Sequence, residues 1–180
     1  MQSDCLNAFL SVNGHVAPVE CRHLQKLAEG KKVLEIGTHH GRSAIAMAAT
    51  ACHVTTIDHY QGDGQIGAPS LQETSYNIEN SGLANKITQV VADWTKWIAG
   101  PVDLEAYDMV FYDGAHCPPY PYEKDFLALC TDFRGIVALH DYKPNEAAMQ
   151  YVVASIDEFS LRTNRPGTIG AGSIMCFPAI

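Results

Sequence analysis

Basic residues are scarce in this chain of 180 residues, which has 12 lysines and arginines against 20 aspartates and glutamates and a formal net charge of −8. Proteins that bind nucleic acid need a basic face that contacts the phosphate backbone. An anionic membrane surface likewise attracts clusters of lysine and arginine. The composition therefore argues against nucleic acid, and against a membrane surface, as the main partner.

Paired cysteines and long apolar runs are absent as well. The six cysteines include no C-x-x-C pair, which argues against a zinc site held by thiolates. No apolar run approaches the length of a membrane span, and the first residues lack the features of a secretion signal. We therefore expect a cytoplasmic protein with reduced thiols. Neither a repeat nor a linker divides the chain, so its length suits a single domain.

Hydrophobic periodicity alternates along the chain between strand and helix spacing. Short apolar runs predict strands over residues 31–37, 53–58, 85–93, 107–113 and 135–141. Helical spacing predicts helices over residues 19–30, 41–50, 71–80, 94–100, 122–130 and 144–159. Ser70 and Glu73 form a capping box for the third helix, and Pro144 suits the first turn of the last. Residues 159–165 and 172–178 are predicted to form a closing pair of strands.

This alternation predicts a single α/β domain. Near-continuous apolar strands separated by helices are typical of a parallel, doubly wound sheet with helices on both faces. We expect a Rossmann-like, mostly parallel seven-stranded sheet with a C-terminal antiparallel hairpin. The sheet would span residues 31–180, after a helical lead-in over residues 1–30.

Aspartates end four of the five predicted parallel strands, at Asp58, Asp93, Asp113 and Asp141. Ligands of an open parallel sheet bind outside the carboxyl ends of the strands, near the point where the strand order reverses. Each aspartate alone fits a turn or a helix cap, because such residues are common there. Four of them on one edge favour a ligand site instead.

The first strand leads into the turn sequence LEIGTHHGRS. Gly37 permits a tight turn, and Gly41 permits close backbone approach where a helix starts. Asp58 lies 21 residues after Gly37, a suitable position for a carboxylate that binds a ribose diol. The pattern alone fits a nicotinamide cofactor, another nucleoside, or a simple turn and cap. It is not the G-x-G-x-x-G spacing, because His39 occupies the second glycine position.

Five segments in order resemble motifs of the class I S-adenosylmethionine-dependent methyltransferases. VLEIGTHHGRSAIAMA is similar to their first motif, in the E-x-G-x-x-x-G-x-S form typical of the family labelled methyltransferase 24. TTIDHY resembles the ribose-binding motif, and VVADW resembles the adenine-flanking motif. FYDGAHCPPYPYEKDF and GIVALHDY resemble the family's D-G-A/S-H and histidine–aspartate segments. The resemblance covers about residues 33–142 and implies S-adenosylmethionine as the cofactor.

The resemblance also implies which residues bind the cofactor. Glu35, Gly37 and Gly41 would surround its methionine end, and Asp58 would bind the ribose hydroxyls. Asp93 and Trp94 would lie beside the adenine, although simple core packing is an alternative for the tryptophan. The full set of implied cofactor-binding residues is Glu35, Gly37, Thr38, Gly41, Ser43, Asp58, His59, Asp93, Trp94 and Asp113.

A metal site is implied where Asp113 and Asp141 end strands that, by the resemblance, are neighbours about 4.8 Å apart. Two carboxylates suit Mg²⁺, Ca²⁺ or Mn²⁺, which would lower the pKa of a substrate hydroxyl. Tyr142 stands where catechol-type relatives have asparagine, so the third ligand is open between His140 and Glu35. Alternatively, the two aspartates only cap loops.

His116 lies three residues beyond Asp113. In the sugar O-methyltransferases of macrolide pathways, which this segment resembles, the corresponding histidine acts as the base. Alternatively, His116 packs against Tyr120 or Tyr122. Hydrogen bonding to loop backbone is the simpler role for three other histidines of this edge, His39, His40 and His59. The predicted catalytic residues are His116, Asp113 and Asp141, and the predicted metal ligands are Asp113, Asp141 and His140.

The leading hypothesis is a metal-assisted O-methyltransferase that uses S-adenosylmethionine and acts on a small hydroxylated molecule. One alternative is a cofactor-binding module without catalysis, such as a sensor or a subunit of a larger assembly. Another is an NAD-dependent oxidoreductase, which the glycine spacing disfavours. A homo-oligomer is compatible with the sequence.

Overall fold

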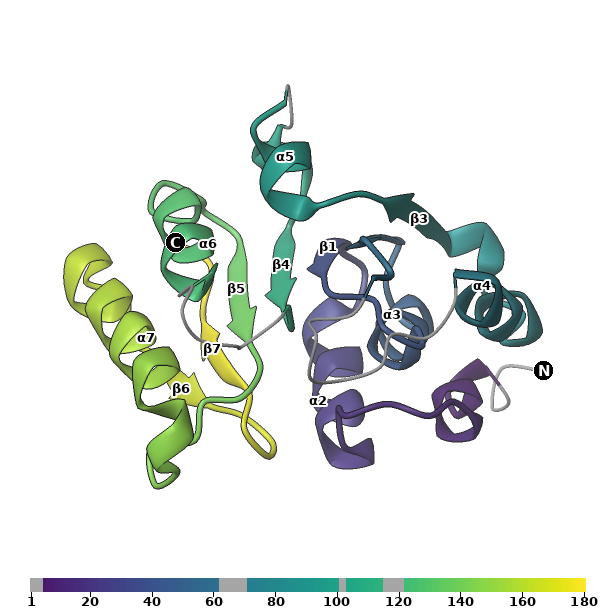
Figure 1. Cartoon of the computed structure of the whole chain (residues 1–180), viewed down its shortest axis with the longest axis horizontal. Coiled ribbons are helices and arrows are strands. Elements are labelled where there is room, and N and C mark those ends of the chain that lie inside the picture. The colour runs from purple at the N-terminus through teal and green to yellow at the C-terminus, as the bar shows by residue number, and fades with distance from the viewer. Residues whose placement is uncertain (1–4, 62–70, 101–102, 115–121) are drawn as a thin grey trace.

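The computed structural model of the chain describes residues 5–61, 71–100, 103–114 and 122–180. Its centre is a seven-stranded sheet with the strand order β3-β2-β1-β4-β5-β7-β6 (Figure 1). Strands β1 to β5 pair in parallel, whereas β7 pairs antiparallel with both β5 and β6. The predicted fold class, a mostly parallel doubly wound sheet with an antiparallel C-terminal pair, is confirmed.

Strands and helices alternate in the predicted order. The strands are β1 (Lys32–Ile36), β2 (His53–Asp58), β3 (Ile87–Val91), β4 (Met109–Tyr112), β5 (Ile136–Leu139), β6 (Thr168–Ile169) and β7 (Met175–Phe177). The α-helices are α2 (Pro18–Ala28), α3 (Arg42–Ala48), α4 (Leu71–Asn80), α5 (Trp94–Ile98), α6 (Tyr122–Leu129) and α7 (Gln150–Thr163). Short 3-10 turns are η1 (Ala8–Ser11), η2 (Ala84–Lys86), η3 (Leu104–Ala106) and η4 (Ala147–Met149).

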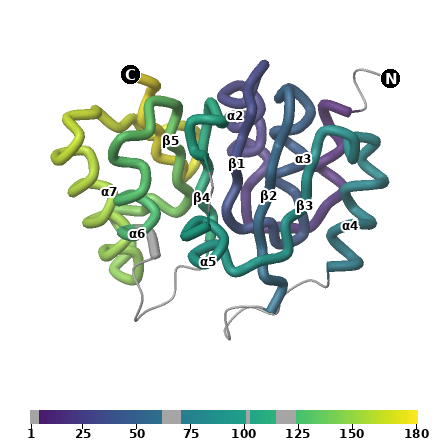
Figure 2. Tube along the Cα trace, turned by 90° about the horizontal axis from the view of Figure 1, so that it is seen from above, coloured from purple at the N-terminus to yellow at the C-terminus, as the bar shows by residue number. Residues whose placement is uncertain are grey.

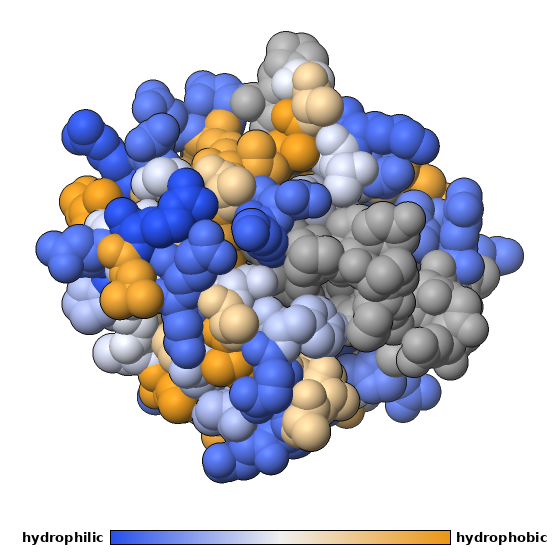
Figure 3. Space-filling model, turned by 60° about the vertical axis from the view of Figure 1, so that its left-hand side comes forward, coloured by the Kyte–Doolittle hydropathy of each residue, from blue (hydrophilic) through white to orange (hydrophobic). Residues whose placement is uncertain are grey.

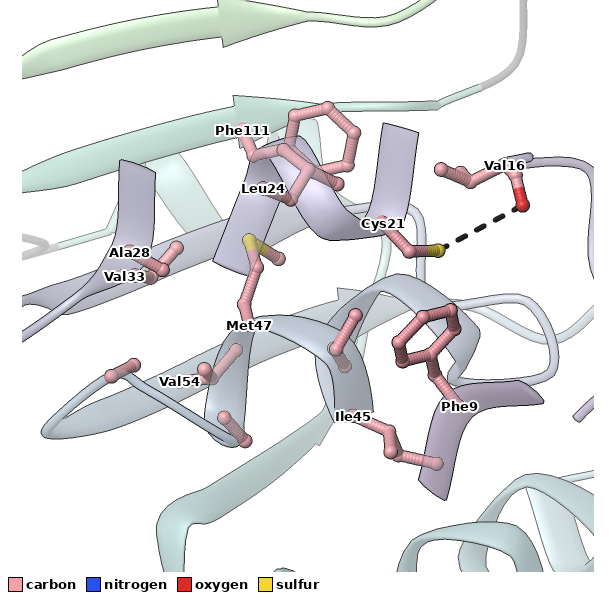
Figure 4. Close-up of a cluster of buried hydrophobic side chains, with 14 of the residues drawn as sticks. Phe9, Val16, Cys21, Leu24, Ala28, Val33, Ile45, Met47, Val54 and Phe111 are labelled. Atoms are coloured by element: carbon pink, nitrogen blue, oxygen red, sulfur yellow. Dashed lines mark hydrogen bonds between the residues drawn. The ribbon is translucent and has the colours of Figure 1, made fainter. Parts of the chain in front are cut away.

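Apolar side chains form a core on each face of the sheet, because successive residues of a strand point to opposite faces. In β4, Phe111 belongs to the cluster that packs against η1, α2 and α3, whereas Tyr112 belongs to the cluster under α6 and α7. Figure 4 shows the first cluster, with Leu24 from α2 and Met47 from α3. At the two ends of the sheet, α4 lies beside β3, and α6 and α7 lie beside β5 to β7 (Figures 1 and 2).

The predicted closing pair of strands is partly wrong. Residues 159–163 continue α7, which ends at Asn164 in the left-handed conformation with a φ of 52°. Phe159 lies on the buried face of this helix, and its ring centroid is 4.9 Å from that of Phe177. The antiparallel pair is instead formed by β6 and β7. The apolar residues at positions 159 and 161 also fit the alternation of a strand, which explains the wrong prediction. The segment is helical because Phe159 packs into the core as part of the buried face of α7.

The predicted start of the last helix at Pro144 is also wrong. The loop after β5 makes its own turn, in which the backbone N–H of Glu146 donates to the carbonyl of Lys143 over 3.0 Å. The Gln150 side chain donates to the Pro144 carbonyl over 2.8 Å, and α7 begins only at Gln150. The turn therefore moves the helix start by six residues from the proline.

Arg165 ties the C-terminal strand to the loop before β5. Its side chain is 1% exposed, and its guanidinium donates to the carbonyls of Phe133 (2.9 Å), Gly135 (2.7 Å), Phe177 (3.5 Å) and Pro178 (2.5 Å). Five N–H donors on one planar group allow this multiple contact. The arginine thereby supplies donors to two carbonyls before β5 and to two at the end of β7.

The outer surface is mixed in character. On the face turned forward in Figure 3, small hydrophobic areas are interspersed with hydrophilic residues. Exposed apolar side chains such as Leu161 on α7 have charged neighbours on the same helix. There, a guanidinium nitrogen of Arg162 lies 3.9 Å from a carboxylate oxygen of Glu158. Among the described residues, no helix combines the length and the apolar character needed to cross a bilayer.

Candidate active site

The tips of β1, β2, β4 and β5 meet at one edge of the sheet. The register pairs Ile36 with Ile57 and Tyr112, and Tyr112 with Leu139. The strand order runs in opposite directions from β1 and β4, and open α/β sheets bind ligands at such a point. The residues that follow this paired row are Gly37, Asp58, Asp113 and His140, so they lie at one level along the edge.

Gly37 makes the turn after β1 in a conformation that excludes side chains. Its φ is 95°, and a Cβ there would lie 2.1 Å from the carbonyl oxygen of Asp113. Gly41 has a φ of 85° and caps α3, but a Cβ there would meet only side-chain carbons of Thr74 and Ile78, at the ordinary contact distances of 3.4 and 3.5 Å. Close approach therefore requires glycine at position 37, whereas backbone conformation requires it at position 41.

Asp58 holds this turn in place. Its Oδ2 accepts hydrogen bonds from the backbone N–H groups of Thr38 (3.0 Å) and His39 (2.9 Å). Its Oδ1 accepts one from the N–H of Tyr60 (2.8 Å). An ionised carboxylate has about four acceptor positions, so these three bonds leave room for one further donor. Binding of a ribose hydroxyl by Asp58 stays a prediction that this geometry permits.

Glu35 is fully buried under the same turn. Its Oε2 accepts from the Thr56 hydroxyl over 2.5 Å, and that hydroxyl lies 2.6 Å from the hydroxyl of Thr38. Burial raises the pKa of Glu35 to about 8, although hydrogen bonds with Ser43 and Thr56 act in the opposite direction. At neutral pH the side chain is therefore largely a neutral acid that supports the turn, and such a group is a poor ligand for a hard cation.

A second polar group forms where β4 and β5 end. The potential ligand atoms of Asp113, His140 and Asp141 all lie within 4.8 Å of one another. His140 Nδ1 is 2.9 Å from Asp113 Oδ1 and 3.6 Å from Asp141 Oδ2. His140 Nε2 is 3.2 Å from Oε2 of Glu20, and the imidazole is 6% exposed. Three carboxylates, two of them distant in sequence and one on the next residue, thus surround one buried imidazole.

These carboxylates determine the charge of His140. Burial lowers the pKa of His140, but the carboxylates of Asp113, Asp141 and Glu20 outweigh this effect and raise it to about 12. A doubly protonated imidazole donates from both nitrogens and offers no lone pair to a metal. The geometry therefore favours Asp113 and Asp141 as a pair of cation ligands. Ligation by His140 stays a prediction that this arrangement does not support.

Glu20 is a site residue that the sequence analysis missed. Its Oε2 accepts from the N–H of Ala17 (2.7 Å), and its Oε1 accepts from the N–H (2.7 Å) and hydroxyl (3.0 Å) of Ser173. Burial raises the pKa of Glu20, but His140 and these donors outweigh it and lower the pKa to about 2. One signal was available, since Glu20 precedes the buried Leu24 and Ala28 by four and eight residues. A carboxylate therefore occupies the buried stripe of α2.

Three other predicted cofactor residues make local structural contacts. The carboxylate of Asp93 caps α5 by accepting hydrogen bonds from the N–H (3.0 Å) and hydroxyl (2.7 Å) of Thr95. Trp94 packs edge-on against Tyr112, with ring centroids 5.7 Å apart. His59 is exposed, and its Nδ1 accepts a hydrogen bond from the backbone two residues on. These contacts fit the capping, packing and loop alternatives, while contacts with a cofactor stay predictions.

Some predicted features lie outside the described residues. They are the proposed base His116, its alternative partner Tyr120 and the capping residue Ser70. The roles assigned to them stay predictions. Ser43 is described and lies buried in α3, where it supports Glu35.

Comparison with known proteins identifies the family. A sequence-family model described as a methyltransferase domain matches residues 34–142. The matched part begins in β1, ends just after β5 and contains every strand tip of the site. The chain belongs to this methyltransferase family. The resemblance to the methyltransferase 24 family of class I enzymes is thereby confirmed. No curated protein sequence matches this methyltransferase.

Solved structures share the fold over nearly the whole methyltransferase. The O-methyltransferase from Bacillus cereus in complex with SAH has a TM-score of 0.64 and 18% identity, covering 98% of this chain and 90% of that one. The O-methyltransferase TomG from Streptomyces achromogenes, in complex with SAM, gives 0.65 and 18%, covering 99% and 89%. Cofactor-bound Rv0187 from MTB gives 0.70 and 15%, covering 99% and 87%. At such identities the likeness shows the fold.

Proposed function

We propose that this methyltransferase transfers the methyl group of S-adenosylmethionine to a hydroxyl oxygen of a small molecule. The observation that carries this proposal is the contact between the Gly37 turn and the backbone of Asp113. It joins the turn expected to bind the cofactor directly to the strand tip expected to face the acceptor. Two structures that share the fold are O-methyltransferases bound to SAH or SAM, which supports S-adenosylmethionine as the methyl donor and an oxygen atom as the acceptor.

The cofactor would lie along the tips of β1 and β2. Gly37 itself presents no side chain there, and Asp58 keeps one acceptor position for a ribose hydroxyl. Asp93 and Trp94, at the start of α5, would flank the adenine. The buried neutral Glu35 would support the turn and so hold the methionine end in place.

The acceptor would lie at the tips of β4 and β5. Its hydroxyl oxygen would form a bond to the methyl carbon while the sulfur–carbon bond breaks and S-adenosylhomocysteine leaves. The hydroxyl proton would pass to His116, acting as the base. Asp113 and Asp141 would hold a divalent cation such as Mg²⁺, Ca²⁺ or Mn²⁺, which, when bound, lowers the pKa of the acceptor hydroxyl.

A turnover assay tests this function. The protein is incubated with methyl-labelled S-adenosylmethionine and a panel of phenols, sugars and hydroxy acids, with Mg²⁺ or with EDTA. We expect S-adenosylhomocysteine to form with at least one of these hydroxylated acceptors and faster with Mg²⁺. Asp141→Asn should remove the response to EDTA, whereas Asp132→Asn, at an exposed position, should not. Cofactor binding without turnover on any acceptor would contradict the proposal and favour a binding module instead.

A further inference from the structure

Asp141 already has a nitrogen-bearing side chain beside each of its carboxylate oxygens. The ammonium of Lys143 lies 2.6 Å from Oδ1, and Nδ1 of His140 lies 3.6 Å from Oδ2. The Asp141 side chain is 15% exposed, so these charges are only partly screened by water. A divalent ion that approaches Asp141 therefore meets the ammonium of Lys143, a cation that belongs to the chain itself.

The loop after β5 brings Lys143 to this position through fixed backbone contacts. Asp141 has a φ of 63°, a left-handed conformation that reverses the chain direction after the strand. The N–H of Tyr142 donates to the carbonyl of Ser173 over 2.9 Å, which holds the loop against the turn before β7. The N–H of Glu146 donates to the carbonyl of Lys143 itself. Backbone bonds on both sides of the lysine thus direct its side chain toward Asp141.

The side chains of His140 and Lys143 differ in their freedom to move. His140 is 6% exposed and is held between the carboxylates of Asp113 and Glu20. Lys143 is 34% exposed, and its four-carbon stem can carry the ammonium into water without a change in the backbone. An incoming ion can therefore displace Lys143 but not His140.

We propose that Lys143 is a tethered cation that occupies Asp141 until a divalent ion displaces it. The inference rests on the proposed function, which places a divalent cation between Asp113 and Asp141. The ammonium lies at Oδ1 of Asp141, and an ion held by Asp113 and Asp141 would compete with it for the same carboxylate, so binding of one is linked to release of the other. The apparent affinity for the ion is then lower than the intrinsic affinity by the fraction of molecules in which Lys143 has left.

The prediction is tested by titrating Mn²⁺ alone into the full chain, with heat and the Mn²⁺ electron paramagnetic resonance signal as readouts. Lys143→Met keeps the stem but removes the ammonium, and we expect Mn²⁺ to bind about five- to thirtyfold more tightly than to wild type, the lower part of the usual range for two competing ligands. Lys96→Met is the matched control, because Lys96 also pairs with an aspartate near a strand tip, Asp93 at 3.4 Å. Its affinity for Mn²⁺ should stay within about twofold of wild type.

Equal or weaker Mn²⁺ binding by Lys143→Met would overturn the proposal, and so would the absence of binding in both proteins. Lys143→Gln serves as a second variant, and melting temperatures confirm that both variants are folded. S-adenosylhomocysteine is titrated into the same samples. If S-adenosylhomocysteine binds but Lys143→Met has the same Mn²⁺ affinity as wild type, only the role of Lys143 as a tethered cation is refuted. If S-adenosylhomocysteine does not bind to wild type, the proposed function is refuted.

Discussion

Replacing Glu20 with glutamine should destabilise the fold, because it removes a buried carboxylate that accepts several hydrogen bonds. Its two oxygens accept hydrogen bonds from Ala17, Ser173 and His140, and every one of these partners is a donor. Glutamine has the same shape but turns one oxygen into an NH₂ group. In either orientation that group faces donors with which it cannot form hydrogen bonds. His140 also loses one of its negative partners.

The magnitude follows from burial. Glu20 and His140 are each 6% exposed, and removing one partner of a buried ion pair typically costs about 3–5 kcal/mol. The cost of the unsatisfied donors is largely included in this figure, because the donors and the ion pair belong to one hydrogen-bond network. For a domain of this size each kcal/mol lowers the melting temperature by about 2–4 °C. We therefore expect a decrease of about 6–20 °C.

Thermal unfolding followed by circular dichroism at pH 7 measures this effect, with Glu79→Gln as the control on an exposed site of α4. The control should stay within about 0.5 kcal/mol of wild type. The pKa of Glu20 is lowered from 4.5 in the unfolded chain to about 2 in the folded protein. The ionised carboxylate therefore contributes fully to the free energy of unfolding above pH 4.5, and this contribution is lost as the pH falls toward 2. The difference between wild type and Glu20→Gln should shrink over that window. A decrease of less than about 2 °C at pH 7 would refute the reasoning.

Asp58→Ala should weaken binding of S-adenosylhomocysteine by about one to two decades, since it removes charge-assisted hydrogen bonds, and an unchanged dissociation constant in calorimetry would remove Asp58 from the site. Because burial raises the pKa of Glu35 from 4.5 to about 8, the free energy of unfolding should fall between these pH values and level off above them. Urea unfolding should show that Glu35→Gln abolishes this fall, and an identical pH profile would contradict the assignment. Arg165→Met should lower the free energy of unfolding by about 3–5 kcal/mol and Arg162→Met by less than about 0.5, and equal melting temperatures would refute the role of Arg165.

The parallel part of the fold was predictable because each strand carries its own signal. Runs such as Met109–Tyr112 are buried on both faces and so read as continuous apolar segments. Their carboxyl ends then had to share one edge, which is why Asp58 and Asp113 could be placed together from sequence alone. The first strand of the closing pair gave no such signal, whereas β7 lies within the predicted residues 172–178. Strand β6 has two residues, both exposed, and exists only because β7 pairs with it.

The charged part of the site could not be read from sequence because its contacts are long-range. Glu20 reaches His140 across 120 positions of the chain and Ser173 across 153. Local patterns show that His140 precedes Asp141, but not that both of its nitrogens face carboxylates. Local patterns likewise show that Lys143 follows Asp141 by two residues. That the ammonium of Lys143 lies against the Asp141 carboxylate depends on the left-handed conformation of Asp141, which only the structure reveals.

The central claim is that the tips of β1 and β2 bind S-adenosylmethionine. Isothermal titration of the full chain with S-adenosylhomocysteine tests it most directly, because binding requires neither an acceptor nor a metal. The account predicts saturable binding at a single site, weakened in Asp58→Ala and unchanged in Asp132→Asn. Absence of binding at millimolar ligand, or displacement of the bound ligand by a nicotinamide cofactor, would contradict it.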